Sequence, residues 1–225
     1  MDEIAEWSNA QQRVIALVSG LRPEQAAVTV PACPDWTVRD LLSHMVGLGA
    51  DVLAGDEPDD HNEEWTARQV DARRGRDVEA LVAEWEVVAE PLRAWMAEHG
   101  TRPLGDITIH EQDMRGALGE PGGRDTPAMA AMRERFVGPF ASRLDASLPP
   151  IALVGEQWSW TSAGHRGSAE AAVELRASDF DLTRALTSRR SAAQLRSWAT
   201  RGDVEPYLGA FATLGPLPER DLTDG

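Results

Sequence analysis

Apolar residues recur at steps of three and four along most of the chain before Pro149, and this spacing restricts the region to amphipathic helices. In residues 3–18 the repeat is carried by Ile4, Trp7 and Val18. The pattern predicts further helices over 37–53, 77–98, 104–118 and 126–148, and a short one around 63–72. Because such helices bury their apolar faces against one another, we expect a helical bundle.

Residues at the ends of these segments are typical helix boundaries. Thr37 is followed three positions later by Asp40, a capping-box pattern in which two side chains satisfy free backbone N–H groups. Gly119 and Pro121 end the helix before them. Pro91 lies inside the 77–98 segment, where it should kink or interrupt the helix.

Pro149 and Pro150 mark the clearest boundary, because the character of the sequence changes there. Beyond them the pattern predicts strands over 151–154, 157–161 and 171–176, and helices over 178–187, 191–200 and 204–212. The expected fold class is α+β, with a helical bundle over residues 1–148 and a small α/β domain over 151–225.

The composition favours some classes of protein and disfavours others. The 225 residues are 42% apolar and 26% charged, which suits a globular protein with an ordinary core. The single cysteine excludes an intrachain disulfide and fits a reducing compartment, and neither a leader-like segment nor a membrane-length apolar run is present. We therefore expect a cytoplasmic protein that does not bind membranes. A net charge of −15 disfavours nucleic-acid binding, because such a surface repels phosphate.

Two histidines and one aspartate are the strongest candidates for chemistry. Asp106 and His110 are four residues apart on one predicted helix, so both can point to the same side, and His44 lies on another. Two imidazoles and a carboxylate would leave a coordination position open, as catalytic metal sites do. The alternative is that these are ordinary core or surface histidines. His61, His99 and His165 are assigned no role.

Three segments together resemble the mycothiol-dependent maleylpyruvate isomerase family. They are residues 33–44 (CPDWTVRDLLSH), 106–115 (DITIHEQDMR) and 178–191 (SDFDLTRALTSRRS). The resemblance implies a DinB-like four-helix bundle followed by a smaller α/β domain. It also implies a divalent metal, usually Zn²⁺, held by His44, Asp106 and His110, with the open position taken by water or by the thiol of mycothiol. Asp106 stands where the family pattern has a glutamate, so the ligand is one methylene shorter.

Other residues carry weaker expectations. Trp36 and Arg39, within the first family-like segment, are candidates for cofactor binding. Arg189 and Arg190 are candidate catalytic residues that could hold a substrate carboxylate or the cofactor, or could equally balance the charge at a helix end. Cys33 is expected to be a structural thiol, because no basic partner is close to it in sequence.

These observations leave three functional classes. The first is a metal-dependent enzyme using mycothiol, in which the metal yields a thiolate for addition to an electrophilic small molecule, as an S-transferase or a cis–trans isomerase of maleylpyruvate type. The second is a metal-dependent hydrolase using metal-bound water. The third is a non-catalytic DinB-like binding module. The expected partners are a small-molecule substrate and a low-molecular-weight thiol, with the chain a monomer or a homodimer.

Overall fold

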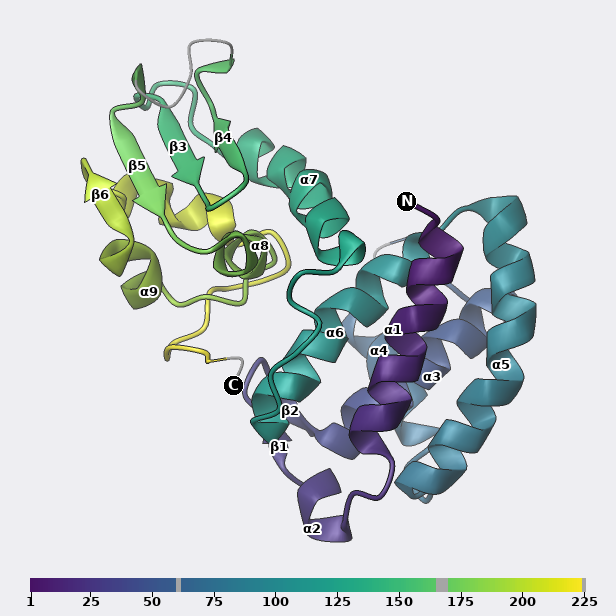
Figure 1. The fold of residues 1–225 in the computed structure, drawn as a ribbon. Helices are drawn as coiled ribbons and strands as arrows, with labels where there is room; N and C mark the ends of the chain where they lie inside the picture. The colour runs from purple at the N-terminus through teal and green to yellow at the C-terminus, as the bar shows by residue number, and fades with distance from the viewer. Residues whose placement is uncertain (60–61, 165–169, 224–225) are drawn as a thin grey trace. The chain divides into compact units, whose positions relative to one another are not determined.

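The computed structural model describes residues 1–59, 62–164 and 170–223. The chain divides into two compact units, residues 1–123 and 124–223 (Figure 1). The first is helical, and the second combines helices with a sheet. The α+β class is therefore confirmed.

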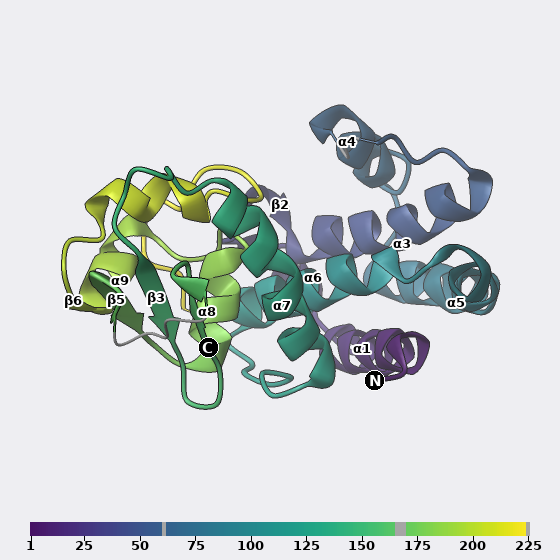
Figure 2. The ribbon, with the colours of Figure 1, turned by 90° about the horizontal axis from the view of Figure 1, so that it is seen from above.

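The first unit is a bundle of four long helices. Helix α3 packs against α5 and α6, and α1 packs against the same two. The short helix α4 lies against α3, on the side away from α1 (Figure 2). In chain order the elements are α1 (Glu3–Val18), α2 (Pro23–Ala26), β1 (Thr29–Val30), β2 (Cys33–Thr37), α3 (Val38–Ala54), α4 (Glu63–Asp71), α5 (Val78–His99) and α6 (Arg102–Leu118).

Local sequence explains where these helices begin and end. Thr37 caps α3, its hydroxyl accepting from the Asp40 N–H while the Asp40 carboxylate accepts from the Thr37 N–H, so the predicted capping box is confirmed. Gly119 follows α6 in the left-handed conformation, at φ 68°, that favours glycine. Helix α5 continues through Pro91 rather than breaking there. None of the described helices is long and apolar enough to cross a membrane.

The bundle core contains aliphatic side chains and tryptophans. Leu41 of α3 is fully buried, and so is Val14 of α1. Trp7 and Trp85 meet edge to face with their ring centroids 6.4 Å apart. The apolar stripes that predicted the helices therefore face the centre of the unit.

Over its described residues, the second unit contains a four-stranded sheet in the order β4-β3-β5-β6, with β3 and β5 parallel and the other neighbours antiparallel. Its core joins helix and sheet residues, among them Phe140, Leu153 and Leu182. The elements are α7 (Pro127–Ser142), β3 (Ile151–Val154), β4 (Ser159–Thr161), β5 (Val173–Arg176), α8 (Asp179–Leu186), α9 (Ala192–Ser197), β6 (Ala199–Arg201) and the 3₁₀-helix η3 (Glu205–Phe211).

The domain boundary differs from the expected one. The units divide between Gly123 and Arg124, not at Pro149 and Pro150. The reason is that α7 packs against α8, and its Phe140 is buried in the core of the second unit. Amphipathic periodicity identifies a helix but does not say which core it joins.

Two local predictions were also wrong. The helix over 126–148 ends at Ser142. Residues 199–201 form the edge strand β6 instead of ending a helix, because they pair with β5. The small antiparallel pair of β1 and β2 was not predicted at all.

Candidate metal centre

His44, Asp106 and His110 meet between two neighbouring helices of the bundle. Helix α3 carries His44, and α6 carries the other two one turn apart. The Nε2 atoms of His44 and His110 lie 3.2 and 3.4 Å from the same Oδ1 of Asp106. All three candidate ligand atoms lie within 4.8 Å of one another. The structure therefore brings together the three residues that the sequence singled out.

Each imidazole has a hydrogen-bonding partner at its Nδ1 atom. His44 Nδ1 lies 2.7 Å from Oε1 of Gln69, and His110 Nδ1 lies 3.0 Å from Oδ2 of Asp113. Both partners are buried. A carboxylate can only accept, so His110 donates its Nδ1–H, and the Gln69 oxygen takes the same role toward His44. In the neutral tautomer set by these bonds, each Nε2 is left as a lone-pair acceptor.

Three acceptors thus converge with no proton among them when both histidines are neutral. The arrangement is favourable only with a positive charge, which is either a proton on an imidazole or a cation. Burial acts to raise the pKa of Asp106, yet the neighbouring His110 and His44 lower it well below its ordinary value. Burial acts to lower the pKa of His110, but Asp106, Asp113 and Cys33 raise it well above 6.5.

The donor set fits a divalent cation. Around a tetrahedral ion with bonds of about 2.0–2.1 Å, neighbouring ligand atoms lie about 3.3 Å apart, which is the spacing of each Nε2 from Asp106 Oδ1. The Asp106 side chain is 20% exposed while His44 is 4% exposed, so solvent reaches the centre at the carboxylate. An ion held here would keep an open position on that side.

Cys33 lies beside the centre, which sequence reasoning missed. Its Sγ is 3.7 Å from Asp113 Oδ2, and Cys33, His110 and Asp113 form a second group of possible metal ligands. His110 belongs to both groups, and its Nδ1 is already bonded to Asp113. We therefore interpret this second group as support for His110. No local pattern pointed to it, because Cys33 and His110 are brought together only by the fold.

The two predicted cofactor-binding residues make different contacts. The Trp36 ring, from β2, packs against the His44 ring with centroids 4.9 Å apart. It thus lines the candidate centre. Arg39 forms an ion pair with Asp40 and donates from Nη1 to the Arg74 carbonyl at 2.9 Å. These contacts hold the first turn of α3, and the role of Arg39 toward a cofactor stays a prediction.

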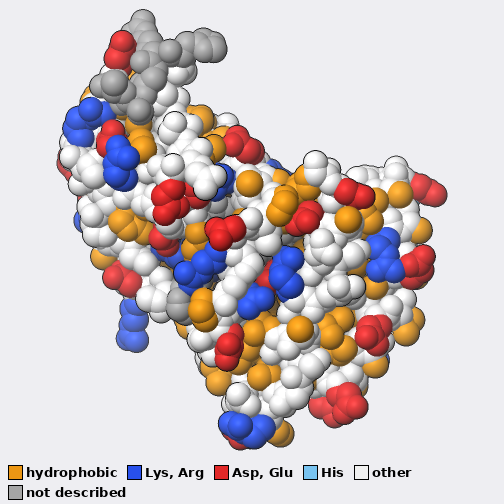
Figure 3. All heavy atoms as spheres, in the orientation of Figure 1, with side chains coloured by type: hydrophobic (Ala, Val, Ile, Leu, Met, Phe, Trp, Pro, Cys, Tyr) orange, Lys and Arg blue, Asp and Glu red, His pale blue; other side chains and the backbone are white. Residues whose placement is uncertain are grey.

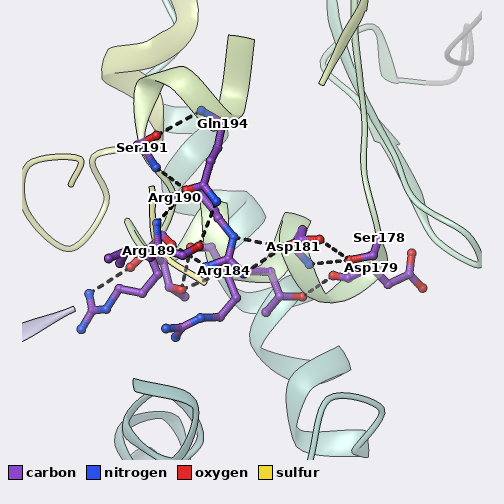
Figure 4. A network of polar contacts seen from close by, with 11 residues as sticks. Ser178, Asp179, Asp181, Arg184, Arg189, Arg190, Ser191 and Gln194 are labelled. Carbon is purple, nitrogen blue, oxygen red and sulfur yellow. Dashed lines mark hydrogen bonds and ion pairs between the residues drawn. The ribbon is translucent and has the colours of Figure 1, made fainter. Parts of the chain in front are cut away.

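Arg189 and Arg190 belong to a polar network of the second unit (Figure 4). Arg190 is buried, and its Nε and Nη2 donate to Asp181 Oδ1 at 3.0 and 2.8 Å. Arg189 donates from Nη1 to the Thr187 carbonyl just beyond α8. The Arg189 contact matches the alternative in which an arginine balances the charge at the end of a helix, whereas Arg190 pairs with Asp181 in the first turn of α8. Their catalytic role stays a prediction.

Of the remaining histidines, His99 lies among the described residues, and it belongs to neither group of possible metal ligands found there. His99 is exposed and stacks on Trp95, whereas His61 and His165 lie outside the described residues. On the face seen in Figure 3, acidic and basic side chains are mixed over the helical unit.

Residues 7–104 match the mycothiol maleylpyruvate isomerase N-terminal domain. This match lies within the helical unit and supports assigning that unit to the family. The matched segment contains His44 and Gln69 and ends before Asp106, so the family match covers one of the three candidate ligands. No curated protein and no solved structure matched the chain.

Proposed function

We propose that the helical unit binds a divalent metal, zinc in the first place, through His44, Asp106 and His110, and that this centre activates the thiol of mycothiol for addition to an electrophilic small molecule. The convergence of two imidazole nitrogens on one carboxylate oxygen supports this proposal most directly. When bound, the ion would stabilise a thiolate near neutral pH, where a free thiol is mostly protonated.

The residues around the centre suit this task. Gln69 and Asp113 hold the two imidazoles in the tautomer that a metal ligand needs. Trp36 covers one side of His44 with an aromatic face. The partly exposed carboxylate of Asp106 leaves one side accessible to a cofactor and a substrate.

The family suggests the reaction but does not choose between its forms. Addition of a thiol to an activated double bond, followed by rotation and release of the thiol, isomerises maleylpyruvate-type acids. Addition to an electrophile that keeps the thiol makes the protein an S-transferase. We infer the shared step, thiol activation. The binding partners are then a low-molecular-weight thiol and a small electrophile.

The first test is the metal content of protein purified without chelator. We expect close to one zinc per chain in the wild type and loss of zinc in His110→Ala. His99→Ala, which changes an exposed histidine of α5, is the matched control and should keep its metal. Absence of metal in the wild type after incubation with zinc would overturn the proposal.

The second test separates thiol chemistry from hydrolysis. Zinc-loaded protein should convert maleylpyruvate, or label a model electrophile, only when mycothiol is added. Cleavage of an ester or amide substrate without any thiol would instead indicate a metal-dependent hydrolase. Stoichiometric zinc without either activity would favour a binding module.

A further inference from the structure

The short helix α4 has a role that its sequence does not reveal. It packs against the face of α3 that carries His44 and Gly47, which are three residues apart. A Cβ added to Gly47 would lie 2.6 Å from Cβ and 2.9 Å from Cγ of Gln69. Gly47 is therefore what allows α4 to approach α3 closely at the level of the metal centre.

Buried contacts near both ends hold α4 in this place. Trp65, near its start, is almost fully buried. Arg73, just after its end, forms a bidentate ion pair with Glu84 of α5, with an Nη2–Oε1 distance of 2.8 Å. Its Nη1 donates to the Gln69 carbonyl at 3.1 Å. The backbone at Gln69 is thus fixed by a side chain that is itself buried and paired.

The side chain of Gln69 links two polar groups of α3. Its Nε2 donates to Asp51 Oδ2 at 2.8 Å, and its Oε1 lies 2.7 Å from His44 Nδ1. The Asp51 carboxylate can only accept a hydrogen bond. The Gln69 amide therefore turns its NH₂ group toward Asp51 and its oxygen toward the His44 imidazole. The chain Asp51–Gln69–His44 therefore sets both the tautomer and the orientation of the ring.

We infer that Gln69 is a positioning residue for the metal ligand His44, and that the docking of α4 on Gly47 sets the affinity of the centre for a divalent cation. This inference rests on the proposed metal function and extends it to a helix outside the four-helix bundle. A ring free to rotate or to move its proton to Nε2 would lose the lone pair directed at Asp106. Partners of this kind commonly change metal affinity by about 10–100-fold when removed.

The test is zinc affinity, measured by competition with a chromophoric chelator on metal-free protein. Gln69→Leu keeps the size of the side chain but removes the acceptor, and we expect zinc binding about 10–100-fold weaker. Gly47→Ala should weaken binding in the same direction, because the added methyl displaces Gln69. Arg68→Ala, on the exposed side of α4, is the matched control and should bind zinc as the wild type does.

A double variant distinguishes positioning from simple stability. Asp51→Asn combined with Gln69→Glu reverses the hydrogen bond between positions 51 and 69. The asparagine then donates to the glutamate, which still accepts from His44 Nδ1. We expect it to restore zinc affinity close to the wild-type value. Melting curves without zinc provide the second readout, since a purely structural role would lower the melting temperature and leave the affinity unchanged.

The outcomes separate this inference from the proposed function. A wild type that binds no zinc overturns both. A wild type that binds zinc while Gln69→Leu binds it equally well overturns the positioning role alone. Failure of the double variant to recover affinity, when it folds as the wild type does, also contradicts the inference.

Discussion

Polar side chains have different kinds of partner in the two units. In the second unit, buried Arg190 is paired with Asp181, whose other carboxylate oxygen accepts from the hydroxyl of Ser178, the N-cap of α8. In the helical unit, Asp106 faces two imidazole nitrogens that carry no proton when the histidines are neutral and bonded through Nδ1 to Gln69 and Asp113. A paired arginine and aspartate need no ligand, whereas converging acceptors need a shared proton or a cation. The sign and number of the groups, more than their burial, distinguish a structural network from a binding site.

A neighbouring contact of the same helix supports this distinction. Glu111 follows His110 and is almost fully buried. Its carboxylate accepts from Arg13 on α1 and from Arg115 one turn later, at distances of 2.8 and 3.1 Å. Adjacent residues of α6 thus enter one ion-pair network with arginines and one group of acceptors that must share a proton or a cation. Proximity in sequence does not decide which role a charged residue takes.

The largest expected effect separates metal binding from folding within α3 and α6. Asp106→Ala should abolish stoichiometric zinc binding and leave the metal-free helical content unchanged, because it removes a ligand and no core contact. Leu41→Ala should lower the free energy of unfolding by about 2–5 kcal/mol and leave the zinc stoichiometry unchanged. Elemental analysis and urea unfolding of the two variants measure both quantities. Loss of metal and of stability together in both variants would contradict the site.

The next effect concerns the complete network of the second unit. Asp181→Ala leaves buried Arg190 without its carboxylate, and we expect a loss of about 1–3 kcal/mol of stability, at the low end because Asp181 is itself partly exposed. Asp181→Asn keeps an acceptor at the same place and should cost less. Zinc affinity should be unaffected in both variants. Thermal unfolding with a parallel zinc titration tests this, and weaker zinc binding would show that the network is more than structural.

A smaller expected effect compares Asp113 and Gln69, the hydrogen-bonding partners of the two imidazoles. Asp113→Ala removes a carboxylate from His110, and we expect zinc binding about 10–100-fold weaker. The loss should exceed that of Gln69→Leu, because a carboxylate makes an imidazole more basic than a neutral amide does. Chelator competition on the two variants, with Arg68→Ala as the common control, gives the order. Equal losses would mean that orientation alone matters.

Sequence patterns predicted the parts of the molecule that depend on neighbouring residues. The helical spacing gave α1 and α3 closely, and the apolar run 151–154 is the strand β3. The spacing of Asp106 and His110 put both on one face of α6. What failed depends on contacts between distant segments, because β6 is a strand only through pairing with β5 and α7 joins the second core through Phe140.

The same limit applies to the candidate site. The sequence singled out the three candidate ligands, and Asp113 was within reach because it lies one turn after His110. Gln69 could not be found, since its segment reads as a polar loop with a short helix and its partner His44 is 25 residues away. Its signal was Gly47, a glycine inside a helix, but the meaning of that glycine appears only when α4 is in place.

The smallest and most gradual effect is the response to pH. Without metal, Asp106 raises the pKa of His110 above its unfolded value, so the stability this contact gives is fully present below about pH 6.5 and is lost as pH rises through the raised pKa. Zinc competes with the same proton, so its affinity should increase with pH over that range and level off above it. Unfolding measured with and without zinc, in wild type and Asp106→Asn, tests both trends. Asp106→Asn should reduce this part of the pH dependence of the metal-free protein, because an amide stabilises the imidazolium less than a carboxylate does while Asp113 remains; an unchanged pH profile would show that another group controls it.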